Sequence, residues 1–182
     1  MNVYVVAKAS QGLANYLGQG ASVVIGYDSR IKSDVFAKTA ASVFAANGIK
    51  VHLWPELNPV PTVSFATRYL HASAGVMITA SHNPSKYNGY KVYGADGCQI
   101  TTEVASTILN EIEKLDIFKD IKTSTFDAAV EEQMIRYIDS SVLDSYIEEV
   151  KKQSVLYNDE VDKNVSITET VNVMLTFSKS LL

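Results

Sequence analysis

The chain has 182 residues, of which 47% are hydrophobic and 20% are charged, as in an ordinary globular protein. A chain this long can bury a core without disulfides, and its single cysteine excludes a disulfide framework and a cysteine-rich zinc site. The formal net charge of −4 argues against a strongly basic nucleic-acid-binding surface. No membrane-spanning run and no signal-peptide pattern are found. We therefore expect a cytoplasmic protein without a nucleic-acid or membrane partner.

The first half of the chain alternates between helical and strand patterns. Apolar residues at three- and four-residue steps predict helices, and short apolar runs predict buried strands. Ser33 is expected to cap the second helix, Asn47-Gly48 to end it, and Pro59 and Pro61 to interrupt regular structure. The expected elements are a helix over 3–17, a strand over 21–26, a helix over 34–47, a strand over 49–53, a helix over 62–71 and a strand over 74–79.

This order predicts an α/β fold with three layers, in which helices cover both faces of a mainly parallel sheet. A further strand is expected over 88–93. The loop before it is too short to hold a crossover helix, so this strand should run antiparallel to its neighbour.

Two more helices are expected in the second half. Their apolar faces are Val104, Ile108, Leu109 and Ile112 in one and Leu143, Tyr146, Ile147 and Val150 in the other. The polar segment 119–133 between them carries no readable pattern. We expect one domain over 1–152, followed by a charged linker that begins at residue 153.

The loop after strand 74–79 carries the chemistry-bearing side chains. Ser81, His82 and Asn83 offer a hydroxyl, an imidazole and an amide beyond a strand end, where ligands bind in α/β sheets. A polar turn without function is the alternative, because serine, asparagine and proline are common in turns. A serine hydrolase is disfavoured because Gly-x-Ser-x-Gly is absent, and because neighbouring side chains on extended backbone diverge.

The segment Thr79-Ala80-Ser81-His82-Asn83-Pro84, followed by Tyr87-Asn88-Gly89-Tyr90-Lys91-Val92, resembles the active-site segment of the α-D-phosphohexomutases. Phosphoglucomutases and phosphomannomutases belong to that family. Gly26-Tyr27-Asp28-Ser29-Arg30 and Asn58-Pro59-Val60-Pro61-Thr62 also have counterparts there. Residues 91–100 are most similar to the branch of long phosphoglucomutases and phosphopentomutases. The resemblance covers roughly residues 1 to 166.

The resemblance implies that Ser81 is a phosphorylated serine in the interconversion of hexose 1-phosphate and hexose 6-phosphate through a bisphosphate. Its phosphate would help to hold Mg²⁺, which makes Ser81 the implied metal contact of this chain, and glucose 1,6-bisphosphate would be the activator. Lys91 would assist proton transfer or stabilise the moving phosphoryl group, and His82 would line the site. Without the resemblance, Lys91 is interpreted as a solvated charge and His82 as a loop-orienting side chain.

Three further residues would support the active site or a phosphate. Arg30 could hold the serine loop or its phosphate, since a guanidinium suits phosphate geometry, although it could also be only a structural partner of Asp28. Asn83 and Asn88 are the other two expected supports.

The sequence also departs from the family. Family members have four domains, and only the first resembles this chain, which lacks the aspartate-rich metal loop of the second domain. Residues 153–182 are interpreted as a linker and a truncated or aberrant start of that second domain, and the chain as a fragment that normally packs against the other domains. We expect it to be inactive alone. The alternatives are an interaction module that keeps the fold, or phosphopentomutase or phosphomannomutase specificity.

Overall fold

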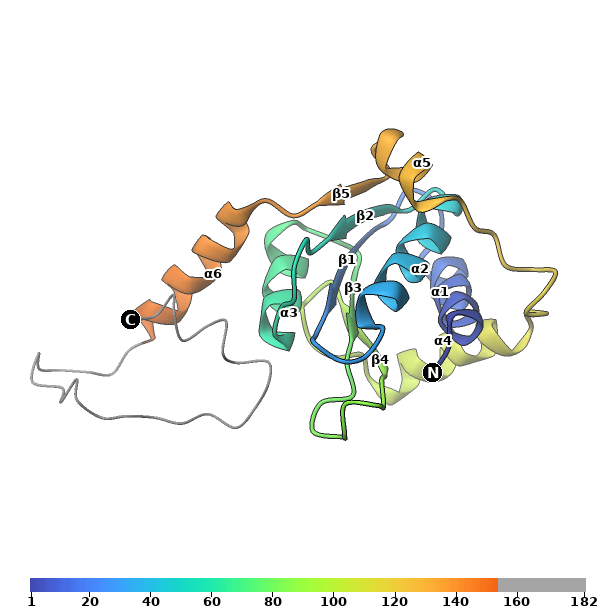
Figure 1. Cartoon of the computed structure of the whole chain (residues 1–182), viewed down its shortest axis with the longest axis horizontal. Helices are drawn as coiled ribbons and strands as arrows, with labels where there is room; N and C mark the ends of the chain where they lie inside the picture. Colours follow the sequence, from blue (N-terminus) through green and yellow to red (C-terminus); the bar gives the residue numbers. More distant parts are fainter. Residues whose placement is uncertain (154–182) are drawn as a thin grey trace, which may run out of the picture.

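Figure 1 shows a computed structural model of the chain, in which residues 1–153 are described. The helices are α1 (Val3–Leu17), α2 (Ser33–Ala46), α3 (Val60–Tyr69), α4 (Thr102–Glu113), α5 (Phe126–Glu131) and α6 (Ser140–Lys152). The strands are β1 (Ser22–Tyr27), β2 (Lys50–Leu53), β3 (Ala74–Ile78), β4 (Tyr90–Gly94) and β5 (Ile135–Tyr137).

The strands form one sheet in the order β4-β3-β1-β2-β5. The pairs β3-β1, β1-β2 and β2-β5 are parallel, and β4 is antiparallel to β3. Helices α1, α2, α4 and α5 pack on one face, and α3 and α6 on the other (Figure 1). The expected three-layer α/β fold with one antiparallel strand is therefore confirmed.

The core divides along the alternation of the central strand β1. Val23 and Ile25 point into the cluster formed with α1 and α2, whereas Val24 points into the cluster formed with α3 and α6. All three side chains are fully buried. Because both faces of β1 are covered, its sequence is continuously apolar rather than alternating.

The start of α3 differs from the expectation. Pro61 lies in the first turn of the helix instead of interrupting it, and α3 begins at Val60. Proline is suited to the first turn because its fixed φ is helical and its missing N–H would have no partner there.

Ser33 does not cap α2 with its side chain. The N-cap residue is Lys32, which has a φ of 64° and makes no capping hydrogen bond through its side chain. The Ser33 hydroxyl instead donates to Asp28 Oδ1 at 3.1 Å. The prediction of a serine cap was wrong because Ser33 is already the first residue of α2, and its oxygen accepts from Asn88 Nδ2 rather than from a backbone N–H of the helix.

The second half holds two elements that the sequence did not predict, α5 and β5. Two apolar residues expected to be buried are also exposed. Leu109 is 51% exposed and Val150 is 40% exposed, although both were expected on buried faces. Val150 lies near the end of α6, where the helix extends away from the sheet (Figure 1). The expectations for residues after 153 lie outside the described residues.

Within residues 1–153, no helix is both long and apolar enough to cross a membrane.

His52 on β2 gives a pH prediction. It faces Arg136 of β5 across the sheet, and its pKa is lowered first by burial and then by the charges of Arg136 and Lys50. Just below the ordinary histidine pKa of about 6.5, His52 is therefore protonated in the unfolded chain but still largely neutral in the folded chain. The free energy of unfolding should fall as the pH drops through this window.

Denaturant unfolding at pH 7.5 and pH 5 checks this expectation. The fall in stability should be smaller in a His52→Gln variant than in the parent chain, because glutamine does not titrate. An equal fall in both proteins would contradict the assignment to His52.

Candidate active site

Two loops meet at the carboxyl ends of the adjacent parallel strands β1 and β3. Residues 28–32 connect β1 to α2, and residues 79–89 connect β3 to β4. The second loop, which we call the serine loop, projects beyond the sheet edge in Figure 1. Residues 81–87 of it are exposed. The expected site residues Arg30, Ser81 and Lys91 are brought together here.

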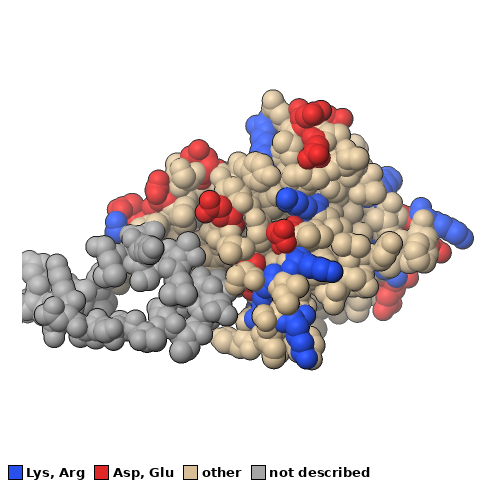
Figure 2. Space-filling model, viewed as in Figure 1, with Lys and Arg blue, Asp and Glu red and all other residues tan. Residues whose placement is uncertain are grey.

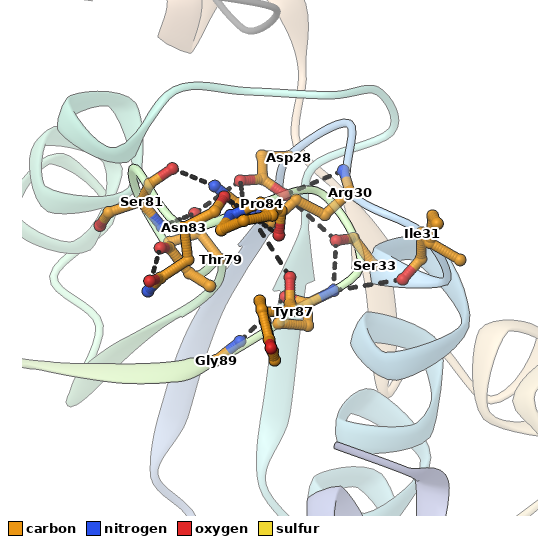
Figure 3. A network of polar contacts seen from close by, with 12 residues as sticks. Asp28, Arg30, Ile31, Ser33, Thr79, Ser81, Asn83, Pro84, Tyr87 and Gly89 are labelled. Carbon is orange, nitrogen blue, oxygen red and sulfur yellow. Dashed lines mark hydrogen bonds and ion pairs between the residues drawn. The ribbon is translucent and has the colours of Figure 1, made fainter.

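Asp28 lies beneath the serine loop and is only 3% exposed. Its Oδ1 accepts hydrogen bonds from Arg30 N and Ser33 Oγ, both at 3.1 Å. Its Oδ2 accepts from Arg30 Nε at 3.1 Å and from Thr79 Oγ1 at 2.5 Å. Figure 3 shows these contacts converging on one carboxylate from both loops. Four donors, one of them cationic, offset the cost of burying the charge.

Arg30 uses its guanidinium on the main chain of the serine loop. Its Nη1 donates to the carbonyl oxygens of Asn83 at 2.6 Å, Pro84 at 3.0 Å and Tyr87 at 3.3 Å. Its Nη2 donates to the carbonyl oxygen of Ser81 (Figure 3). Arg30 therefore pairs with Asp28 and also holds the serine loop, which are two of the three roles that the sequence left open. A contact between Arg30 and a phosphate stays a prediction.

Ser81 has a backbone φ of 53°, in the left-handed region that residues other than glycine rarely adopt. Its N–H donates to Thr79 Oγ1 at 3.0 Å. Lys91 comes from β4, where it pairs with Met77 of β3, and its Nζ donates to Ser81 Oγ at 2.5 Å. An ammonium group therefore contacts an exposed hydroxyl that the loop presents to solvent.

The three remaining expected residues differ in their roles. The His82 side chain is exposed and makes no hydrogen bond within residues 1–153. Asn83 Nδ2 donates to the carbonyl of Ala80 at 3.1 Å. Asn88 Nδ2 donates to Ser33 Oγ at 2.7 Å, and its Oδ1 accepts from Gly89 N at 3.0 Å. Both asparagines are thus occupied in shaping the loop.

Sequence reasoning assigned no site role to Thr79, Ser33 or Gly89. Thr79 bridges Asp28 and Ser81, and Ser33 bridges Asp28 and Asn88. Gly89 closes the loop by accepting from Thr79 N at 3.0 Å, and an added Cβ would meet Thr79 O at 2.6 Å. Thr79 and Gly89 lie inside the motif that resembles the family, and this motif was the available signal for them. Ser33 was interpreted only as a helix cap.

Residues 1–118 match the family described as phosphoglucomutase/phosphomannomutase, alpha/beta/alpha domain I. The chain belongs to the phosphoglucomutase/phosphomannomutase family. It is 40% identical to a phosphoglucomutase of Staphylococcus saprophyticus over 83% of this chain and 28% of that protein. It is also 40% identical to a phosphoribomutase of Saccharomyces cerevisiae over 87% of this chain and 27% of that protein.

A solved structure of a family member supports the fold. A candidate phosphomannomutase from Thermus thermophilus is 28% identical, with a TM-score of 0.70 over 84% of this chain and 32% of that chain. The present chain thus spans about 28% of the length of the curated phosphoglucomutase that it matches.

The phosphoglucomutase/phosphomannomutase family uses Mg²⁺. Among residues 1–153, no group of three or more His, Cys, Asp or Glu side chains could hold a metal ion. The carboxylate of the network, Asp28, already accepts four hydrogen bonds. The described residues therefore do not fit a magnesium site by themselves, since Mg²⁺ requires about six oxygen ligands.

The electrostatic surroundings of the serine loop suit an anion. Arg30 and Lys32 lie in the loop after β1, and Lys86 and Lys91 come from the serine loop and β4. The charge of Arg30 is paired with Asp28, so within residues 1–153 the three lysines supply the unpaired positive charge here. Figure 2 shows Lys and Arg side chains gathered where the serine loop projects. Clustered positive charge raises the local concentration of anionic ligands such as phosphate esters.

Proposed function

We propose that this chain carries the phosphoserine of a phosphohexomutase and that Ser81 is the residue phosphorylated. The observation that carries the proposal is the 2.5 Å contact between Lys91 Nζ and the exposed Ser81 Oγ. A serine loop held by Arg30 and surrounded by positive charge supports it. The substrates would be sugar phosphates, with interconversion of hexose 1-phosphate and hexose 6-phosphate as the favoured reaction.

The proposed step is a phosphoryl transfer to and from Ser81. An Oγ–P bond forms while the bond between phosphorus and a sugar oxygen of the bisphosphate breaks. Ser81 Oγ loses its proton and the sugar oxygen gains one. Lys91 Nζ is close enough to exchange this proton with Oγ: as a neutral amine it would accept the proton while the phosphoryl group arrives, and as an ammonium it would return the proton while the group leaves. The ammonium form also stabilises charge on the moving group.

The loop geometry supports this step mainly through alignment, which is the principal requirement of phosphoryl transfer. His82 is exposed beside Ser81 and would line the site against the sugar phosphate. Asn83 and Asn88 would keep the loop in shape. The phosphate on Ser81 would supply one oxygen ligand to Mg²⁺, with the remaining ligands coming from outside residues 1–153.

The proposal includes the organisation of the larger protein. Residues 1–152 would be one domain, residues 153–182 would lead into a second, and other mutase domains would pack against the first. We also propose a cytoplasmic location, with which the single free Cys98 is compatible. The 40% identity to a phosphoribomutase keeps a pentose phosphate as the second candidate substrate. The absence of a metal-binding group among residues 1–153 favours an interaction module as the non-enzymatic alternative.

Labelling of the chain with phosphate tests the proposal. Incubation with glucose 1,6-bisphosphate and Mg²⁺ should label Ser81, and phosphopeptide mapping by mass spectrometry would identify the site. Labelling should be slow, because residues 1–153 lack a group of carboxylates for the metal. Ser81→Ala should abolish it, because alanine has no oxygen to phosphorylate.

Ser85 supplies a matched control, since it is an exposed serine in the same loop. Ser85→Ala should be labelled like the parent chain. Labelling at Ser85 or elsewhere, or labelling that survives Ser81→Ala, would refute the assignment of Ser81. Failure of the parent chain to accept any phosphate would favour the interaction module.

A further inference from the structure

We infer that Asp28 is a positioning residue for the phosphorylation of Ser81, because its single carboxylate holds both ends and the middle of the serine loop. This inference rests on the proposed function. Asp28 makes no hydrogen bond with Ser81 itself. It acts through Thr79, Ser33 and Arg30, which reach three different parts of the loop.

The first connection fixes the start of the loop. The Thr79 hydroxyl donates to Asp28 Oδ2 at 2.5 Å and accepts from the Ser81 N–H at 3.0 Å. Because the carboxylate can only accept here, it orients the hydroxyl so that an oxygen lone pair faces Ser81 N. The carboxylate therefore stabilises the left-handed backbone of Ser81, which has a φ of 53°.

The second connection fixes the end of the loop. Ser33 Oγ donates to Asp28 Oδ1 at 3.1 Å and accepts from Asn88 Nδ2 at 2.7 Å. Asn88 in turn accepts from Gly89 N at 3.0 Å, directly before β4 begins. Lys91 is two residues further along, so the same carboxylate is coupled to both partners of the Lys91–Ser81 contact.

The third connection fixes the middle of the loop. Arg30 Nε donates to Asp28 Oδ2, while the terminal nitrogens of Arg30 donate to loop carbonyls (Figure 3). A guanidinium is planar, so anchoring Nε to a carboxylate also sets the direction of its other N–H groups. Removing the carboxylate would release the orientation of Arg30 as well as the two hydroxyl bridges.

The inference predicts a specific effect of removing one hydroxyl. Thr79→Val keeps the shape of the side chain but removes the acceptor of Ser81 N–H. The amide exchange rate of Ser81 should rise and the rate of Ser81 labelling by glucose 1,6-bisphosphate should fall, each by about tenfold, because the Ser81 N–H loses its hydrogen bond and Asp28 loses one donor. Thr79→Ser should restore most of both, because serine keeps the hydroxyl.

Thr67 is the matched control. It is also a buried threonine, and its hydroxyl donates to Val63 O at 2.7 Å within α3. Thr67→Val should lower thermal stability without changing the Ser81 exchange or labelling rates. Comparison of the two variants separates a local effect on the serine loop from a general loss of stability.

Asp28→Asn tests the convergence of the three connections. The asparagine side chain presents one acceptor oxygen and one NH₂ group to four hydrogen-bond donors, so several of the present hydrogen bonds are lost. The backbone N–H groups of Ser81 and Gly89 should therefore both exchange faster. The rate of Ser81 labelling should fall by about a hundredfold. If this variant does not fold, Thr79→Val and Ser33→Ala decide the question, with effects expected at Ser81 and at Gly89, respectively.

Two failures are distinguishable in this experiment. Unchanged exchange at Ser81 in Thr79→Val and at Gly89 in Ser33→Ala would overturn the positioning role of Asp28. A parent chain that takes up no phosphate at Ser81 would overturn the proposed function, while the exchange comparison would still decide whether Asp28 holds the loop.

Discussion

Replacing Arg30 with methionine should lower the free energy of unfolding by about 3–5 kcal/mol, the usual result of removing one partner of a buried ion pair. The Arg30 side chain is 9% exposed and the Asp28 side chain 3% exposed, so water screens the pair little. Methionine leaves Asp28 buried without a cation and leaves the loop carbonyls of Asn83 and Pro84 without their donor. Urea unfolding followed by circular dichroism measures the change.

Lys32 provides the control for this prediction. It is exposed, carries the same charge and lies two residues from Arg30. Lys32→Met should alter the free energy of unfolding by less than about 0.5 kcal/mol, as exposed substitutions usually do. Equal stabilities of the two variants would show that the pair between Arg30 and Asp28 contributes little to folding.

Replacing Lys91 with methionine should slow the transfer of phosphate to Ser81 by about 10²–10³, the usual cost of losing one preorganised donor in an active site. Lys91 Nζ donates to Ser81 Oγ at 2.5 Å, and methionine has a similar length but no charge or proton. The measurement is the initial rate of Ser81 labelling by glucose 1,6-bisphosphate, with quantification of the Ser81 phosphopeptide.

Lys86 separates a specific effect of Lys91 from a general effect of positive charge. It lies in the exposed serine loop, with its Nζ 5.3 Å from the centre of the Tyr87 ring. Lys86→Met should slow labelling only slightly. If both lysine variants slow labelling equally, the serine loop attracts the bisphosphate by charge alone and Lys91 has no role in the transfer.

The sequence predicted those elements in which apolar side chains recur at a regular spacing over several helical turns or fill a whole strand. The helix over 3–17 agrees with α1 in both bounds, and β4 runs antiparallel as its short preceding loop required. Strand β5 escaped prediction because three residues are too few to display alternation. The exposure of Leu109 could not be foreseen, because it depends on which residues of α4 face α1.

The candidate site was predictable as a set of residues but not as a network. The motif pointed to Ser81 and Lys91, which lie in contact. For Arg30 the residue type allowed a carboxylate, a phosphate or a loop as the partner. The actual loop acceptors lie 51 to 57 positions away in the chain, and no local pattern carries that information. For the same reason, the Ser33 hydroxyl was assigned to a local cap.

The contacts of Arg30 with the serine loop involve main-chain oxygens only. Every amino acid carries such an oxygen, so this attachment does not depend on the side chains at 82, 85 and 86. Those positions can therefore mutate while the path of the loop is preserved. The support of the loop and the surface that it presents therefore rest on different atoms, so a substitution at these positions can change the surface without removing the support.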